Sequence, residues 1–264
     1  MQETKIEVDS QKILRLPLSS STLKKMNLDT SQIRTKFEQE GFIVLPPTPG
    51  VWIKDVSEIF NGNVKADKHY LRVQTEFGWN EHKDIQIVSE TELFGETDVP
   101  WHADWSYGPG SYDGTILQCN FDQANTPTHF VDMHTVYNDA CKVFGQAQVE
   151  GLRLMSGKYS PPEELAYCFE EKSFRYLKRN PKERSIVFDH PISGKPVMYF
   201  SPGTITNYPK GFDISKYTKL LDDNSFVHYW EPGQTVIWDN LRYHHRRSKF
   251  NGKRELLRIQ FKYA

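Results

Sequence analysis

The sequence predicts a mainly β (α+β) fold with a double-stranded β-helix, or jelly-roll, core and flanking helices. Short strand-like runs alternate with Gly, Pro and Asn turns, as is typical of jelly rolls and related barrels. No Gly-rich loop joins a strand to a helix, so a nucleotide-binding α/β fold is not indicated. With 38% hydrophobic and 13% aromatic residues, the chain can bury one large core. We therefore expect a single domain over residues 1–264.

The first expected elements are a helix and the strand that follows it. Thr30 or Ser31 can cap a helix that ends at Gly41. Residues 42–45, Phe-Ile-Val-Leu, then form a strand that Pro46 terminates. The chain thus enters the sheet directly from a helix.

The remaining elements follow from the spacing of apolar residues. Helical spacing predicts helices over 51–60, 135–143 and 214–221. β-like runs predict strands over 85–88, 115–121, 128–132, 186–188, 197–200, 226–230, 235–238 and 256–263. An aromatic-rich insertion over 157–181 is either a lid or a helix packed on the barrel, and packing is the commoner fate of such aromatics.

Composition and charge exclude several classes of protein. The 33 basic and 34 acidic side chains give a net charge of -1, too small to attract nucleic acid or an anionic membrane. The three cysteines form no Cys-x-x-Cys motif, so neither a disulfide framework nor a thiolate zinc site is indicated. No apolar run approaches the roughly 18 residues that span a bilayer. We expect a cytoplasmic protein with a small-molecule partner. The oligomeric state stays open, and a homo-oligomer is one alternative.

The segment Trp101-His102-Ala103-Asp104 carries the first candidate metal ligands. In a strand-like segment, residues two apart lie on the same face, so His102 and Asp104 can reach one metal ion. A second His-x-Asp, His82-Lys83-Asp84, lies among polar residues, where a solvated surface role is favoured.

A further candidate ligand follows the turn Asp239-Asn240, where His244 and His245 are adjacent. Two imidazoles and one carboxylate on one face of an octahedron form the facial triad of non-haem Fe(II) oxygenases. The same ligands also suit a zinc hydrolase, since zinc takes three protein ligands and a water. A β-roll binding protein without metal is the third alternative.

The last predicted strand places Arg254 and Arg258 on one face. A buried arginine needs an anionic partner, and a planar guanidinium matches a carboxylate. The alternative to an anion-binding site is a solvated basic edge, because further basic residues surround this segment. A nucleic-acid patch is disfavoured by the near-zero net charge.

These motifs resemble the taurine dioxygenase (TauD/TfdA) superfamily of Fe(II)- and 2-oxoglutarate-dependent oxygenases, from about Glu92 to Ala264. The resemblance rests on the Trp-His-x-Asp segment, the strand Thr128-His129-Phe130-Val131-Asp132-Met133, the Trp-Asp-Asn turn at 238–240, the distal His and the following Arg. It implies that His102, Asp104 and His245 bind iron. Because the interval from His to Arg is two residues shorter than in taurine dioxygenase, His244 stays open as the distal ligand.

The resemblance also implies the cosubstrate site and the chemistry. Thr128 and Arg254 are expected to hold the distal carboxylate of 2-oxoglutarate, and Arg258 to meet cosubstrate or substrate. Fe(II), 2-oxoglutarate and O2 would then give succinate, CO2 and an oxidised substrate. The carboxylate ligand Asp104 favours hydroxylation over halogenation, while desaturation and oxidative bond cleavage remain alternatives.

The expected substrate is a small charged or zwitterionic metabolite. Asp98 can meet an amine and Arg258 an anionic group, while Trp105 and Tyr107 can line the pocket mouth. The alternative role for Asp98 is to cap the turn before Pro100.

Overall fold

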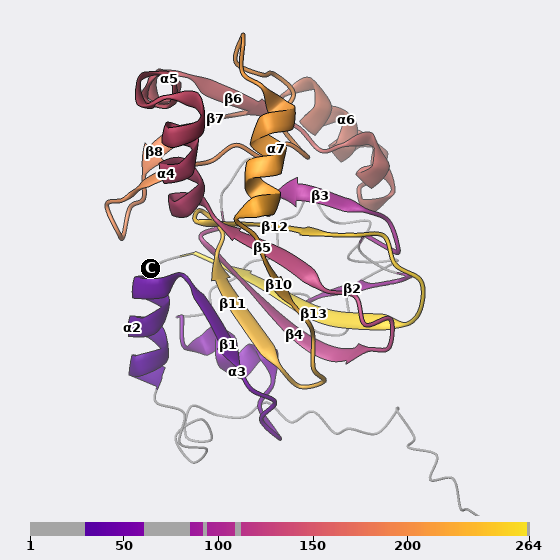
Figure 1. Ribbon diagram of the computed structural model, residues 1–264. Helices are drawn as coiled ribbons and strands as arrows, with labels where there is room; N and C mark the ends of the chain where they lie inside the picture. Colours follow the sequence, from indigo (N-terminus) through magenta and orange to yellow (C-terminus); the bar gives the residue numbers. More distant parts are fainter. Residues whose placement is uncertain (1–29, 61–84, 92–93, 109–111, 263–264) are drawn as a thin grey trace, which may run out of the picture.

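Two antiparallel sheets form the centre of the computed structural model, which describes residues 30–60, 85–91, 94–108 and 112–262. The five-stranded sheet has the order β1 (Phe42–Leu45), β11 (Thr235–Asp239), β4 (Gly114–Asp122), β13 (Arg254–Phe261) and β2 (Gln86–Ser89). The four-stranded sheet has the order β10 (Phe226–His228), β5 (Thr128–Asp132), β12 (Tyr243–Arg247) and β3 (Val99–His102). Figure 1 shows the two sheets as facing layers.

Aromatic side chains join the two layers. The rings of Phe130 in β5 and Trp238 in β11 lie 5.3 Å apart, and Phe42 in β1 lies 4.9 Å from Phe130. Phe130 and Trp238 are fully buried. Such contacts fix the separation of the sheets, so side chains from both layers can face one shared pocket.

Helices cover the outer face of each sheet. On the side of the five-stranded sheet, α2 (Thr30–Glu40) and α3 (Ile53–Glu58) bury Phe37, Ile53 and Val56 against Ile237 and Leu257. On the side of the four-stranded sheet lie α4 (Met133–Phe144) and α7 (Ile214–Asp223), followed along the chain from α4 by α5 (Gln146–Gly151) and the 3-10 turn η3 (Leu152–Leu154). The predicted helices over 135–143 and 214–221 are therefore present with slightly longer bounds.

The aromatic-rich insertion forms a compact layer beyond the four-stranded sheet. Residues 157–181 contain most of β6 (Ser156–Tyr159), all of η4 (Glu163–Cys168) and all of α6 (Glu171–Arg179). The strands β7 (Lys182–Ser185), β8 (Val187–Asp189) and β9 (Pro196–Met198) follow. Tyr159, Phe169 and Phe174 are buried in the main core, whereas Tyr167 and Tyr176 are exposed. Most of these aromatic side chains of the insertion thus pack in the core.

Strand β12 is one of the elements that the sequence did not predict, together with β6, β7 and α5. Its residues, Tyr-His-His-Arg-Arg, have no apolar alternation, although all of them are buried or half-buried. It pairs with β5 on one side and β3 on the other. Its position between two strands, which the local sequence does not encode, stabilises it as a strand.

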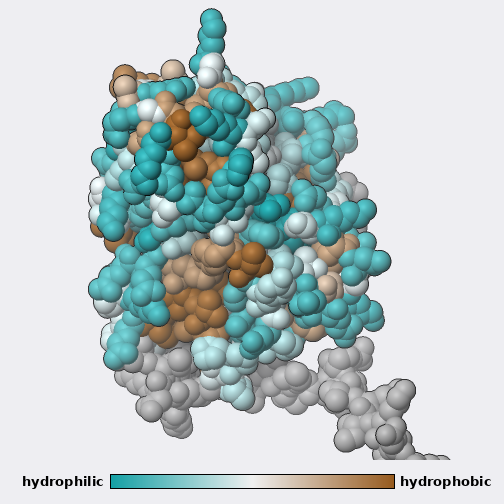
Figure 2. All heavy atoms as spheres, in the orientation of Figure 1, coloured by the Kyte–Doolittle hydropathy of each residue, from teal (hydrophilic) through white to brown (hydrophobic). Residues whose placement is uncertain are grey.

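An apolar surface patch marks the place where the two sheets meet at one edge. Figure 2 shows it over β1 and β10, whose exposed side chains include Val44, Phe226 and Val227. The rings of Phe42 and Phe226 lie 5.0 Å apart, so these two edge strands are side by side. Within the described parts of the chain, no helix has the length and hydrophobicity needed to cross a membrane.

Candidate active site

His102 and His245 face each other across neighbouring strands. They are direct partners in the antiparallel pair of β3 and β12, and their ring centroids lie 4.2 Å apart. Directly opposed residues in such a pair have side chains on the same face. Each imidazole places Nε2 at 3.8 Å from Oδ1 of Asp104. The ligand atoms of the three residues all lie within 4.8 Å of one another.

Asp104 reaches this cluster from a turn and not from strand alternation. Strand β3 ends at His102, and Asp104 begins the following turn. Its backbone N–H donates to Oδ1 of Asn240 (2.8 Å), and its carbonyl accepts from Nδ2 of Asn240 (2.9 Å). Thr115 in β4 donates to its carboxylate (3.0 Å). His102 and Asp104 do lie close together, as expected. A turn held by Asn240, and not alternation along one strand, brings Asp104 there.

His244 points to the opposite side of β12. It is fully buried, with Nε2 at 3.4 Å from the hydroxyl of Ser201 and its ring edge-on to Tyr199. Burial lowers the pKa of His244 to about 3, so this imidazole is neutral. Of the two adjacent histidines, His245 is the one that joins His102 and Asp104.

The protonation states of the cluster suit a metal ion. Nδ1 of His102 lies 2.8 Å from the carbonyl of Pro100, which assigns the proton to Nδ1 and leaves Nε2 as the free acceptor. That buried Nε2 has no hydrogen-bond partner. Burial lowers the pKa of both His102 and His245. Burial alone would raise the pKa of Asp104, but Arg258 and the two histidines bring it below its ordinary value.

A cavity opens beside the cluster, and three arginines line it. Arg254 is 1% exposed; its guanidinium lies 3.4 Å from the hydroxyl of Thr128 and 3.8 Å from Asp122. Its Nε is buried and has no hydrogen-bond partner. Burial lowers the pKa of Arg254 to about 10, which still leaves it charged at neutral pH. The cavity therefore presents a buried cation that a carboxylate would neutralise.

Arg258 contacts the cluster itself. One guanidinium nitrogen donates to Oδ1 of Asp104 (3.0 Å), and Nε donates to Oε1 of Gln86 (2.7 Å). The expected position of Arg258 near the candidate iron site is thus observed. Asp104 and Gln86 thus hold two nitrogens of its guanidinium, and a role for Arg258 towards a substrate anion stays a prediction. Gln86 carried no motif that would have identified it from the sequence.

Arg247 is one of the basic residues near the last strand, and it lines this cavity. It is 5% exposed, and it donates to the carbonyls of Gly95 (2.8 Å) and Thr97 (2.7 Å). Burial and, to a smaller extent, the charge of Arg254 lower its pKa to about 9. The solvated edge that was the alternative for these basic residues does not describe Arg247, because its side chain is buried on the cavity wall.

The three expected substrate residues divide into two groups. Trp105 and Tyr107 are buried and line a second cavity, whose wall also includes His102 and Asp104. Asp98 is exposed and lines neither cavity. A role for Asp98 in binding a substrate amine therefore has no support in the structure. The alternative motif at His82 lies outside the described residues.

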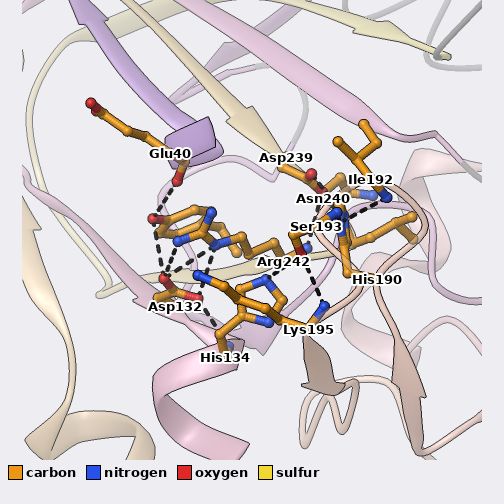
Figure 3. Close-up of polar contacts among 12 residues, drawn as sticks. Glu40, Asp132, His134, His190, Ile192, Ser193, Lys195, Asp239, Asn240 and Arg242 are labelled. Carbon is orange, nitrogen blue, oxygen red and sulfur yellow. Dashed lines mark hydrogen bonds and ion pairs between the residues drawn. The ribbon is translucent and has the colours of Figure 1, made fainter. Parts of the chain in front are cut away.

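A polar network fixes the turn that carries Asn240 (Figure 3). Oδ1 of Asp239 accepts from the backbone N–H groups of Leu241 and Arg242, and Oδ2 lies 2.9 Å from Nε2 of His190. Arg242 forms an ion pair with Asp132 at 2.6 Å. The turn is thereby held to β5 and to the loop at His190, and it presents Asn240 to Asp104.

Comparisons with known proteins match this chain to one family. The family model described as "Taurine catabolism dioxygenase TauD, TfdA family" matches residues 21–260. A taurine dioxygenase from Burkholderia xenovorans superposes with a TM-score of 0.65 at 15% identity, over 95% of this chain and 83% of that one.

Two further solved structures have similar scores. AAD-2, in complex with Mn(II) and N-oxalylglycine, gives a TM-score of 0.64 at 17% identity, covering 95% of this chain and 90% of that one. A putative alpha-ketoglutarate dependent 2,4-D dioxygenase from Burkholderia xenovorans gives 0.64 at 19% identity, covering 94% and 90%. At these identities the structures establish a shared fold.

Proposed function

The chain belongs to the TauD, TfdA family of dioxygenases, and from this premise we propose that it hydroxylates a small-molecule substrate with release of succinate and CO2. The match over residues 21–260 confirms the resemblance that the motifs indicated and extends it towards the N-terminus. Family membership implies a metal ion, 2-oxoglutarate and O2 as the reacting components. The arrangement of two facing antiparallel sheets supports the jelly-roll core expected from the sequence.

One observation carries the proposal: three metal-ligating atoms converge beside a cavity that contains a buried arginine. His102, Asp104 and His245 supply two neutral nitrogens and one anionic oxygen, the donor set of the Fe(II) facial triad. The buried Nε2 of His102, which lacks a hydrogen-bond partner, is consistent with a metal ligand. When bound, Fe(II) with 2-oxoglutarate would supply the oxidising chemistry.

The residues around the triad have distinct roles in this proposal. Arg254 and Thr128 would bind the distal carboxylate of 2-oxoglutarate, because they lie together at the end of the cavity formed by β13 and β5. Arg258 and Thr115 hold the carboxylate of Asp104, and Pro100 orients His102. Such outer contacts fix ligand orientation in metal sites. The arginine-lined cavity disfavours the zinc hydrolase, which has no need for a dicarboxylate.

The type of oxidation, hydroxylation, is also part of the proposal. Asp104 keeps a carboxylate among the ligands, which favours hydroxylation over halogenation, and desaturation or bond cleavage are the alternative outcomes. The decisive test is binding of 2-oxoglutarate to the Fe(II)-loaded protein under anaerobic conditions, followed by succinate formation after O2 is admitted. We expect saturable binding and metal-dependent succinate release. Absence of 2-oxoglutarate binding to the metal-loaded protein would refute the proposal.

A further inference from the structure

The two cavities meet at the candidate metal site but differ in chemistry. They share Phe94, Val99, His102 and Asp104. Arg247, Arg254 and Arg258 line the first cavity, and none of them lines the second. The basic side chains are thus confined to the cosubstrate side of the cluster.

Among the described residues, the wall of the second cavity is almost entirely apolar. Apart from His102 and Asp104, it is formed by Phe94, Val99, Pro100, Trp105, Tyr107, Pro162, Leu165, Gly203 and Thr204. The hydroxyl of Thr204 is already hydrogen-bonded to Ser106 at 2.8 Å. Asp104 would be engaged by the metal, so a charged group entering this cavity would find no counter-charge on these walls. Burial of such an unpaired charge is strongly unfavourable.

Two aromatic residues of this cavity occupy a backbone conformation that bulky side chains rarely adopt. Phe94 has φ of 71° and Trp105 has φ of 57°. Backbone outliers of this kind persist where the surrounding structure enforces them, and they concentrate at functional sites. Two bulky aromatics with this conformation on the wall of one cavity therefore indicate that their positions matter for binding.

An arginine holds each of these two turns. Arg247 donates to the carbonyls of Phe94, Gly95 and Thr97. Arg184 in β7 donates to the carbonyls of Trp105, Ser106 and Gly108. Both aromatic walls are therefore fixed by their own set of charge-assisted hydrogen bonds.

Close packing also fixes the Trp105 indole. A Cβ atom at Gly108 would lie 1.9 Å from its Nε1, so the indole occupies the space that a side chain at position 108 would fill. The ring also packs against Tyr107 and Phe169, with centroids 5.3 and 6.5 Å away. The cavity wall at Trp105 is thus set before any ligand binds.

Resting on the proposed function, we propose that the substrate of this enzyme is an uncharged molecule whose apolar, oxidised part binds in the second cavity. The charged or zwitterionic substrate expected from the sequence required Asp98 and Arg258, and neither has a side chain available in this cavity. Pro162 and Leu165 from the insertion form its outer wall, so this part of the chain contributes to substrate selection.

The test uses three probes that share one alkyl chain: n-butanol, butyrate and n-butylammonium. The protein is loaded with Mn(II) and saturating 2-oxoglutarate, so that butyrate does not report on the arginine-lined cavity. Paramagnetic relaxation of the probe methyl protons then measures occupancy near the metal without turnover. We expect relaxation enhancement for butanol at least about tenfold above that of either charged probe, as one unpaired buried charge implies. Equal or larger enhancement for a charged probe, or none for butanol, overturns the proposal.

A pair of leucine variants locates the binding. Leu165→Asp should abolish the butanol effect, whereas Leu154→Asp should leave it unchanged, because Leu154 is 93% exposed and lines neither cavity. An unchanged butanol effect in Leu165→Asp overturns the assignment of the cavity. Should Leu165→Asp fail to fold, Leu165→Asn replaces it.

Titration of 2-oxoglutarate into each Mn(II)-loaded protein precedes the relaxation measurement. Failure of that titration in the wild type refutes the oxygenase function itself. Normal 2-oxoglutarate binding combined with a preference for charged probes refutes only the substrate class.

Discussion

Asn240 brackets Asp104 by accepting a hydrogen bond from its backbone N–H at 2.8 Å and donating one to its carbonyl at 2.9 Å. A third bond, from Nδ2 to the carbonyl of Tyr112, completes the set at 3.0 Å. These contacts connect two segments separated by 136 residues and set the backbone from which the carboxylate projects. Asn240 is therefore a positioning residue for the candidate metal ligand.

Replacing Asn240 tests this positioning role. Asn240→Ala leaves buried backbone groups without partners, each at a cost of about 1–3 kcal/mol, so we expect lower stability. Loss of an outer contact to a metal ligand should also weaken Mn(II) binding by about 10- to 100-fold. Thermal unfolding and metal titration measure the two effects. Asn180→Ala is the control, because Asn180 is exposed and caps α6. Equal Mn(II) affinity in the two variants would contradict the positioning role of Asn240.

The two adjacent histidines of β12 provide a second test. His245→Ala should weaken Mn(II) binding by more than about 100-fold, beyond the effect of losing an outer contact. His244→Ala should retain metal binding but destabilise the fold by about 2–4 kcal/mol, since it leaves a cavity at a fully buried position. Metal titration with chemical denaturation separates these outcomes. The reverse pattern would assign the ligand to His244.

The cosubstrate site makes a third prediction. Arg254→Leu should weaken 2-oxoglutarate binding to the Mn(II)-loaded protein by about 2–5 kcal/mol, the range for removing one partner of a buried charge pair. Lys253→Leu, at the exposed neighbouring position, should have no such effect. Arg258→Leu should affect this affinity less than Arg254→Leu does, because Asp104 and Gln86 hold Arg258. Isothermal titration gives all three values, and unchanged affinity in Arg254→Leu would contradict the assignment.

The stability of the metal-free protein should depend on the protonation of His134. Burial lowers its pKa below the ordinary value of 6.5, so between these two pKa values the unfolded chain binds the proton more readily than the folded one. Stability is therefore full above pH 6.5 and falls as the pH drops towards the folded pKa. His134→Gln cannot titrate, so its loss of unfolding free energy with acid should be smaller than that of the wild type. Parallel curves for the two proteins over this range would contradict the prediction.

The resemblance to a family and most of the secondary structure were predictable because they depend on local patterns. The strand β5 has the expected bounds of 128–132, and β4 and β11 differ from the expected ranges by at most one residue at each end. Each is a short run rich in apolar and β-branched residues, with turn residues beyond its ends. β12 was missed because its polar residues are stabilised by strands on both sides, which no local pattern records.

By itself, the sequence determined which residue types are present for an iron and 2-oxoglutarate site, and alternation along β13 correctly placed Arg254 and Arg258 in one cavity. Tertiary structure decided how they are used. The pairing of β3 with β12 selected His245 over His244 as the neighbour of His102, and the hydrogen bonds of Asn240 brought Asp104 to both. Asp104 and Gln86 each hold one nitrogen of Arg258, and the insertion contributes apolar residues to the wall of the second cavity. The physical reason is that side-chain direction follows from local backbone geometry, whereas partners and burial depend on segments distant in the sequence.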